Sequence, residues 1–184
     1  MTPKDIVEVI QKHEKWTTSQ AHGARARFQL QDLSGFVFAG CNLRGALFSG
    51  AILNGTNFSY ADLSEADMFG AIMIDCNLSG AKLAGADLTK AILRDSDMRE
   101  GTMMRGDTSE GLVVVEARKE PVVTTAVTFE QADLSGARLS RTSLIDSNLR
   151  NAMLSQTDLR GADLSGANLT NASLAKADLS GATL

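Results

Sequence analysis

The sequence predicts a solenoid of five-residue units, and two regularities in the 184-residue chain indicate it. Leu, Phe or Met occupies every fifth position from Phe28 to Met103 and again from Phe129 to Leu184, which makes 28 units. Two residues before these positions, Ala is present in 17 of the 28 units, and most of the remaining units have another small residue there. A period of five matches neither the helical period of 3.6 nor the strand period of 2, so the chain must turn at every unit.

Each unit supplies one large and one small apolar side chain, two residues apart. In extended backbone such residues point to the same side, so both should face the inside of a narrow tube. The residues around them are mostly Asp, Asn, Ser and Gly, which favour turns. A unit this short cannot bury its own apolar face, and stacking of units must therefore form the core.

Units such as Ala61–Glu65, Ala86–Lys90 and Ala162–Gly166 resemble the A-(D/N)-L-x-x units of the pentapeptide-repeat family, and the resemblance covers residues 26–105 and 127–184. It implies an all-β fold, a right-handed quadrilateral parallel β-helix in which four units make one square coil. Sixteen units before the break then make four coils, and twelve after it make three. Seven coils stacked at about 4.8 Å give a core roughly 34 Å long.

Residues 1–25 are predicted to form a short helix and a connector. Thr2 suits the N-cap, Pro3 suits the first helical position, and Asp5 suits the positive end of the helix over 2–16. An apolar stripe at helical spacing follows, made of Ile6, Val9, Ile10, His13 and Trp16. Since the end of a solenoid exposes its core, we expect this helix to cover it, with docking onto a partner as the alternative.

The early units place Phe at every second position, at Phe28, Phe38, Phe48 and Phe58. In a four-sided coil this spacing puts the rings on two opposite faces. The sequence therefore predicts two ladders of stacked Phe rings inside the tube.

The repeat is interrupted at about 106–126, within a domain that spans 26–184. The step from Met103 to Phe129 exceeds a whole number of units by one position, so the phase slips there. One interpretation is a degenerate coil with a bulge, which would bury Arg118 at a high cost. The favoured interpretation is a hairpin that leaves the coil, with strands at Leu112–Val115 and Val122–Val123.

Such a hairpin is the least repeat-like surface of the chain and a candidate for partner binding, with a tolerated insertion of no role as the alternative. The candidate residues combine β-branched and basic side chains: Leu112, Val113, Val115, Arg118, Lys119, Val122 and Val123.

No constellation for catalysis is apparent. His13 and His22 are the only histidines and lie outside the repeats, so a Ser–His–Asp triad has no base and no metal-ligand spacing exists. We therefore expect no enzyme activity and no cofactor or metal. Cys41 and Cys76 take the small inward position almost two coils apart, too far for a disulfide. No signal peptide and no long apolar stretch are present, so we expect a cytoplasmic chain outside the membrane.

The predicted function is a non-catalytic protein–protein interaction or scaffold module with an unidentified partner. The resemblance implies an alternative, because some pentapeptide-repeat proteins mimic DNA, bind gyrase or topoisomerase IV and protect against fluoroquinolones. A stretch of duplex about 34 Å long carries roughly 20 negative charges, whereas this chain has a net charge of −4, which argues against mimicry and against direct nucleic-acid binding. The repeats run up to Leu184, so we also expect an end-to-end homodimer through the last coil, or a longer natural chain.

Overall fold

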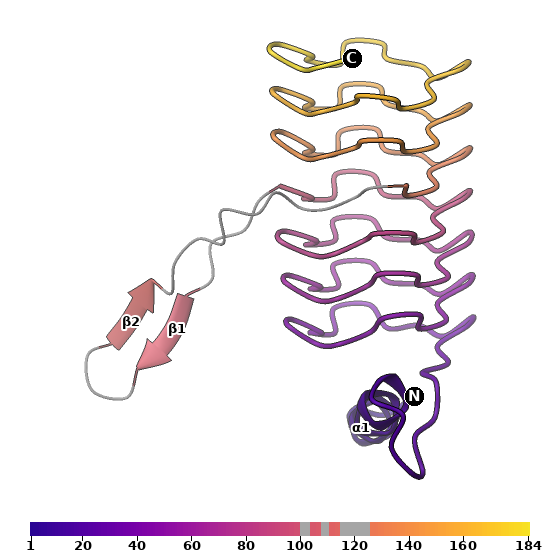
Figure 1. Cartoon of the computed structure of the whole chain (residues 1–184), viewed down its shortest axis with the longest axis vertical. Helices are drawn as coiled ribbons and strands as arrows, with labels where there is room; N and C mark the ends of the chain where they lie inside the picture. Colours follow the sequence, from indigo (N-terminus) through magenta and orange to yellow (C-terminus); the bar gives the residue numbers. More distant parts are fainter. Residues whose placement is uncertain (100–103, 108–110, 115–125) are drawn as a thin grey trace.

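The structure is a computed structural model of the chain, and it describes residues 1–99, 104–107, 111–114 and 126–184. Its helix is α1 (Pro3–Thr17), and its two strands are β1 (Met104–Asp107) and β2 (Gly111–Val114). Figure 1 shows a stack of four-sided coils, with α1 at the N-terminal end and the β1–β2 hairpin to one side.

The coils are joined by single-residue parallel β-bridges, which connect residues 20 positions apart on either side of the insertion and 41 positions apart across it. One such column runs through Arg27, Leu47, Asp67, Asp87, Thr128, Asn148 and Asn168, which gives seven rungs. The backbone N–H groups on each side of a coil donate to both the following and the preceding coil. The N–H of Leu53 donates to the Ile72 carbonyl at 2.7 Å, and the N–H of Ile52 donates to the Gln31 carbonyl at 2.9 Å. No side of a described coil is long enough to be a strand, so bridges replace the short strands that the sequence predicts.

The inward positions form the core, as predicted. Phe28, Leu88 and Leu159 have no exposed surface, and the small residues before such positions are buried with them. Burial weakens in the last coil, where Leu174 is half-buried and Leu184 is 77% exposed.

The two aromatic ladders are confirmed. Phe28 and Phe48 stack with ring centroids 5.1 Å apart, and Phe38 and Phe58 stack at 5.3 Å. The ladders meet edge to face inside the tube, as between Phe48 and Phe58 at 5.7 Å. Offset stacking and edge-to-face contact are the two arrangements that aromatic rings prefer.

The Asp or Asn before the large inward residue has a specific partner. Asp62 Oδ1 accepts the N–H of Ser64 at 3.0 Å, and the same bond joins Asp87 to Thr89 and Asn168 to Thr170. These N–H groups do not take part in the bonds between coils. The short polar side chain therefore satisfies a donor that the coil leaves open.

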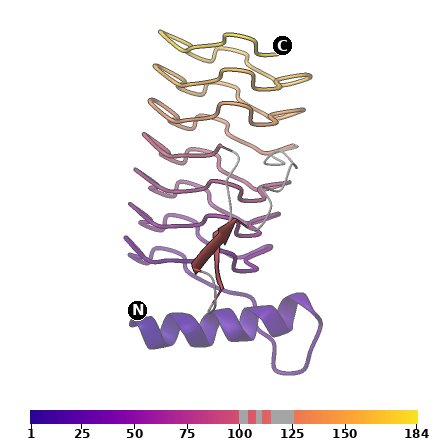
Figure 2. The ribbon, with the colours of Figure 1, turned by 90° about the vertical axis from the view of Figure 1, so that its left-hand side faces the viewer.

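Helix α1 lies across the first coil (Figure 2). It begins with the predicted N-cap, since Thr2 Oγ1 accepts the N–H of Asp5 at 3.3 Å and Asp5 Oδ2 accepts the N–H of Thr2 at 2.8 Å. Ile6 is buried against the core, and the buried His13 accepts the N–H of Ala26 on Nδ1 at 3.0 Å. The helix thus closes the N-terminal end and bonds to the start of the first coil.

At the break, the coils on either side contact each other directly. With the usual spacing of 20 positions, Asp87 would bridge to position 107, but it bridges to Thr128 instead. The length of the insertion is therefore the difference between positions 107 and 128. The Thr142 hydroxyl donates to the Met98 carbonyl at 3.1 Å across the same junction. The described chain therefore has no coil between them, which is incompatible with a degenerate coil at that place.

The described strand pairing is one that the sequence did not predict. Strand β2 pairs antiparallel with β1, from Met104 opposite Val114 to Asp107 opposite Gly111. The predicted partner, Val122–Val123, lies outside the described residues, as does Met103. Three positions separate β1 from β2 in the sequence, and bringing two segments together costs less entropy when fewer residues lie between them.

Candidate interaction surface

The residues predicted to bind a partner are only partly placed. Leu112 and Val113 lie in β2. The other five lie outside the described residues: Val115, Arg118, Lys119, Val122 and Val123. The hairpin as a binding element therefore stays a prediction.

The described coils next to the break contain a second feature, a hollow of about 610 Å³ lined by Arg99, Ser140, Arg141, Arg160 and Gly161. We call it the arginine hollow. It lies on one face of the solenoid, over the coils on both sides of the insertion.

The register across the insertion brings these residues together. Asp97 bridges to Arg138, and Arg138 bridges to Asp158. The residues two positions later, Arg99, Ser140 and Arg160, therefore follow one another in three successive coils. Ser140 is small and lies between two arginines, which leaves space for the hollow.

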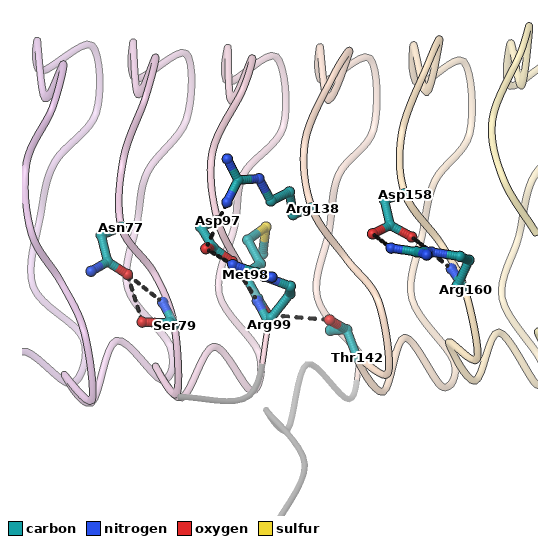
Figure 3. Close-up of polar contacts among 9 residues, drawn as sticks. All are labelled: Asn77, Ser79, Asp97, Met98, Arg99, Arg138, Thr142, Asp158 and Arg160. Atoms are coloured by element: carbon teal, nitrogen blue, oxygen red, sulfur yellow. Dashed lines mark hydrogen bonds and ion pairs between the residues drawn. The ribbon is translucent and has the colours of Figure 1, made fainter. Parts of the chain in front are cut away.

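Two of the arginines are held by aspartates of their own unit (Figure 3). Arg99 donates through Nε and Nη2 to the two oxygens of Asp97 at 2.8 and 2.6 Å, and Arg160 does the same to Asp158 at 2.8 and 2.9 Å. The residues of each pair flank an inward residue, so both point outward and meet. Hydrogen bonds from Arg99 hold the pKa of Asp97 below its ordinary value, and those from Arg160 lower the pKa of Asp158.

The third arginine of the lining, Arg141, and the neighbouring Arg138 are less constrained. Arg138 Nη1 lies 3.6 Å from Asp97 Oδ2. The backbone N–H of Arg141 donates to the Arg160 carbonyl at 2.9 Å, but its side chain has no hydrogen-bond or ion-pair partner among the described residues, and Arg141 sits at a turn position with a positive φ of 61°. Its Cγ would lie 3.7 Å from a Cβ on Gly161, so the absence of a side chain there gives Arg141 room.

The same face is neutral one coil earlier. Asn77 Oδ1 accepts both the N–H and the hydroxyl of Ser79, at 3.0 and 2.6 Å, in the place of the Asp97–Arg99 pair (Figure 3). The arginines are therefore confined to the coils around the insertion. Sequence reasoning missed this cluster because it depends on the length of the insertion.

The hollow can donate hydrogen bonds to an anion, and its described lining offers no general base to activate the Ser140 hydroxyl. His13 belongs to α1 at the N-terminal end of the stack, and burial lowers its pKa. Cys76 is in the core, where its thiol donates to the Leu53 carbonyl at 2.8 Å and burial raises its pKa to about 12. Within the described residues, no cluster of three His, Cys, Asp or Glu could hold a metal ion. No described helix is long and apolar enough to cross a bilayer.

A family model described as pentapeptide repeats matches eight copies in this chain, over residues 32–70, 71–105, 125–161 and 147–184. No curated protein matches it.

Several solved structures are similar to the chain. A pentapeptide repeat protein from the thylakoid lumen of Arabidopsis thaliana is 29% identical, with 72% of this chain and 71% of that one covered and a TM-score of 0.35. HetL, involved in heterocyst differentiation regulation in Nostoc sp. strain PCC 7120, is 23% identical over 99% and 96%, with a TM-score of 0.23. QnrB1, a plasmid-mediated fluoroquinolone resistance protein, is 21% identical over 88% and 87%, with a TM-score of 0.27.

Proposed function

Because this chain belongs to the pentapeptide repeat family, we propose that it is a non-catalytic scaffold or interaction module for a protein partner. In each unit, the inward residues fill the core and the outward residues face the solvent. The outward side chains stand in columns set by the seven-rung bridge ladder. This fixed display is the observation that carries the proposal.

A rigid display favours recognition for a physical reason. Association costs free energy when loops and side chains become ordered, and a surface that is ordered beforehand avoids part of that cost. Most backbone carbonyl and N–H groups of a coil already bond to a neighbouring coil. The specificity for a partner therefore depends on the outward side chains. The family likeness also supports a right-handed quadrilateral β-helix for these coils, and a cytoplasmic location remains a prediction.

DNA mimicry is the less supported alternative. Residues 26–99 and 126–184 hold 14 Asp or Glu and 11 Lys or Arg, which gives a net charge of −3 for the described coils. A duplex of the same length carries roughly 20 negative charges. Ion pairs neutralise several of the carboxylates, for example Arg94 with Asp133 at 3.1 Å and Arg44 with Glu65 at 2.6 Å.

Affinity capture from the native cells tests the scaffold proposal. The intact chain should retain one or a few proteins at stoichiometric level, and a variant that lacks Leu112–Val123 shows whether the hairpin contributes. A DNA supercoiling assay with gyrase tests the alternative in parallel. Inhibition by low-micromolar chain, or rescue of gyrase from a fluoroquinolone, would reverse the ranking.

We also propose that the 184-residue chain pairs end to end through its last coil. The Leu164 N–H donates to the Thr183 carbonyl at 2.7 Å, whereas the equivalent N–H of Leu169 has no backbone acceptor in the described chain. Open N–H groups beside partly exposed leucines favour pairing with another edge. Sedimentation equilibrium should show a dimer, and a strict monomer at high concentration would refute this pairing.

A further inference from the structure

We propose that the arginine hollow binds the carboxylates of an acidic segment on a partner protein. This inference rests on the proposed function and adds the chemistry of the partner to it.

The donors in the hollow are abundant and already oriented. A guanidinium has five N–H groups, and the forked bonds of Arg99 and Arg160 to Asp97 and Asp158 engage two nitrogens of each. Among the described residues, three N–H groups of each arginine then have no partner and can bind a ligand. Because the aspartates hold both side chains, a ligand does not pay to order them.

The charge around the hollow also favours an anion. Its described lining has three arginines, and no carboxylate is among these lining residues. The hydrogen bonds to Asp97 raise the pKa of Arg99, the negative charge of Asp158 raises it further, and the positive charge of Arg160 lowers it. Arg99 and Arg160 both line the hollow, so a carboxylate bound there would lie near both guanidinium groups. Planar guanidinium groups match the two oxygens of a carboxylate.

A peptide fits the surroundings better than a nucleic acid. Asp97, Asp158 and Asp178 follow the same face beside the arginines, and the chain has a net charge of −4. A phosphodiester backbone laid along this face would pass these carboxylates with a charge at every residue. The carboxylates of a peptide are on flexible side chains, so one or two can enter a hollow of about 610 Å³ while the others turn away from these aspartates.

Fluorescein-labelled octaglutamate is the probe, and fluorescence anisotropy at low salt is the readout. Arg141→Gln removes the arginine whose side chain has no partner among the described residues. Gln131 and Gln156 occupy the same unit position with φ of 58° and 60°, so the backbone should tolerate glutamine there. Lys176→Gln is the matched control, because Lys176 has the same unit position and φ of 60° in another part of the surface.

A second matched pair guards against an effect on folding. Arg160→Gln changes the hollow, and Arg150→Gln changes the corresponding arginine two sides away in the same coil. We expect each hollow variant to bind octaglutamate roughly tenfold more weakly, the size of one charge-assisted hydrogen bond. Both controls should bind like the wild type, and all four should keep its circular dichroism.

Three results would overturn the inference: no binding of octaglutamate by the wild type, equal losses in hollow and control variants, or tighter binding of octathymidylate. If affinity capture finds a partner that Arg141→Gln retains fully, the hollow is not its site and the scaffold function stands. If affinity capture finds no partner but octaglutamate binds at the hollow, the proposed scaffold function is refuted and the carboxylate-binding site stands.

Discussion

The aromatic ladders predict that Phe48 stabilises the coil more than Phe129, although both occupy the same column and neither has exposed surface. Phe48 has three ring neighbours: Phe28 at 5.1 Å, Phe58 at 5.7 Å and Phe38 at 6.4 Å. Phe129 has no ring neighbour in the described structure. Substitution by leucine removes a similar apolar volume at both sites, and leucine already fills other positions of this column, so the difference isolates the ring contacts.

The two closer ring pairs of Phe48 set the magnitude. Each is worth about 0.5–1.5 kcal/mol beyond its buried area, so Phe48→Leu should cost roughly 1–3 kcal/mol more than Phe129→Leu. Urea unfolding of both variants gives this difference if circular dichroism and fluorescence report one transition. Hydrogen exchange would locate the loss, since coils of a solenoid can open separately. Equal costs, or a larger cost at Phe129, would refute the ladder argument.

Three further predictions concern single residues. Burial lowers the pKa of His13, so near pH 6.5 the unfolded chain binds a proton that the folded α1 cap does not. The stability of this cap should therefore fall as the pH drops below that value. The fluorescence of the single tryptophan, followed from pH 8 to pH 5, should report this change, and a constant signal would contradict it. Cys76, with its pKa raised to about 12, should react with a maleimide at pH 8 only after denaturation, and rapid labelling of the native chain would disprove its burial. Gly80→Ala and Gly55→Ala each place alanine at positive φ, but a Cβ at Gly80 would lie 2.5 Å from the Tyr60 ring and one at Gly55 would meet nothing within 4 Å, so Gly80→Ala should melt lower; equal melting would show that the ring moves freely.

The sequence alone predicts the coil well because the repeat is local. Phe28 and Phe48 stack since the units between them have equal length, and the coil of four units follows from the family resemblance. The N-terminal cap is similarly local, because Thr2 and Asp5 lie within one helical turn. In each case the residues that interact are a known number of positions apart.

Contacts across the insertion could not be predicted in this way. Arg99 and Arg160 lie close together on one face because of the length of the insertion between Asp87 and Thr128. The repeat shifts by one position for any insertion whose length is a whole number of units plus one residue. The shift alone therefore does not give the length of the segment that leaves the coil. Without that length, Arg99 cannot be placed beside Arg141. The pairing of β2 with β1 was not predicted for a related reason, since β-branched residues favour strands but do not select the partner strand.

Site-specific photo-crosslinking tests the central claim, that outward positions of a rigid solenoid recognise a protein. A benzophenone amino acid at Ser140, inside the arginine hollow, would be compared with one at Glu130, which has the same unit position two sides away in the same coil. In native cells, we expect a discrete protein adduct from position 140 that excess octaglutamate suppresses, and little from position 130. Equal or absent protein crosslinking from both positions would contradict the account.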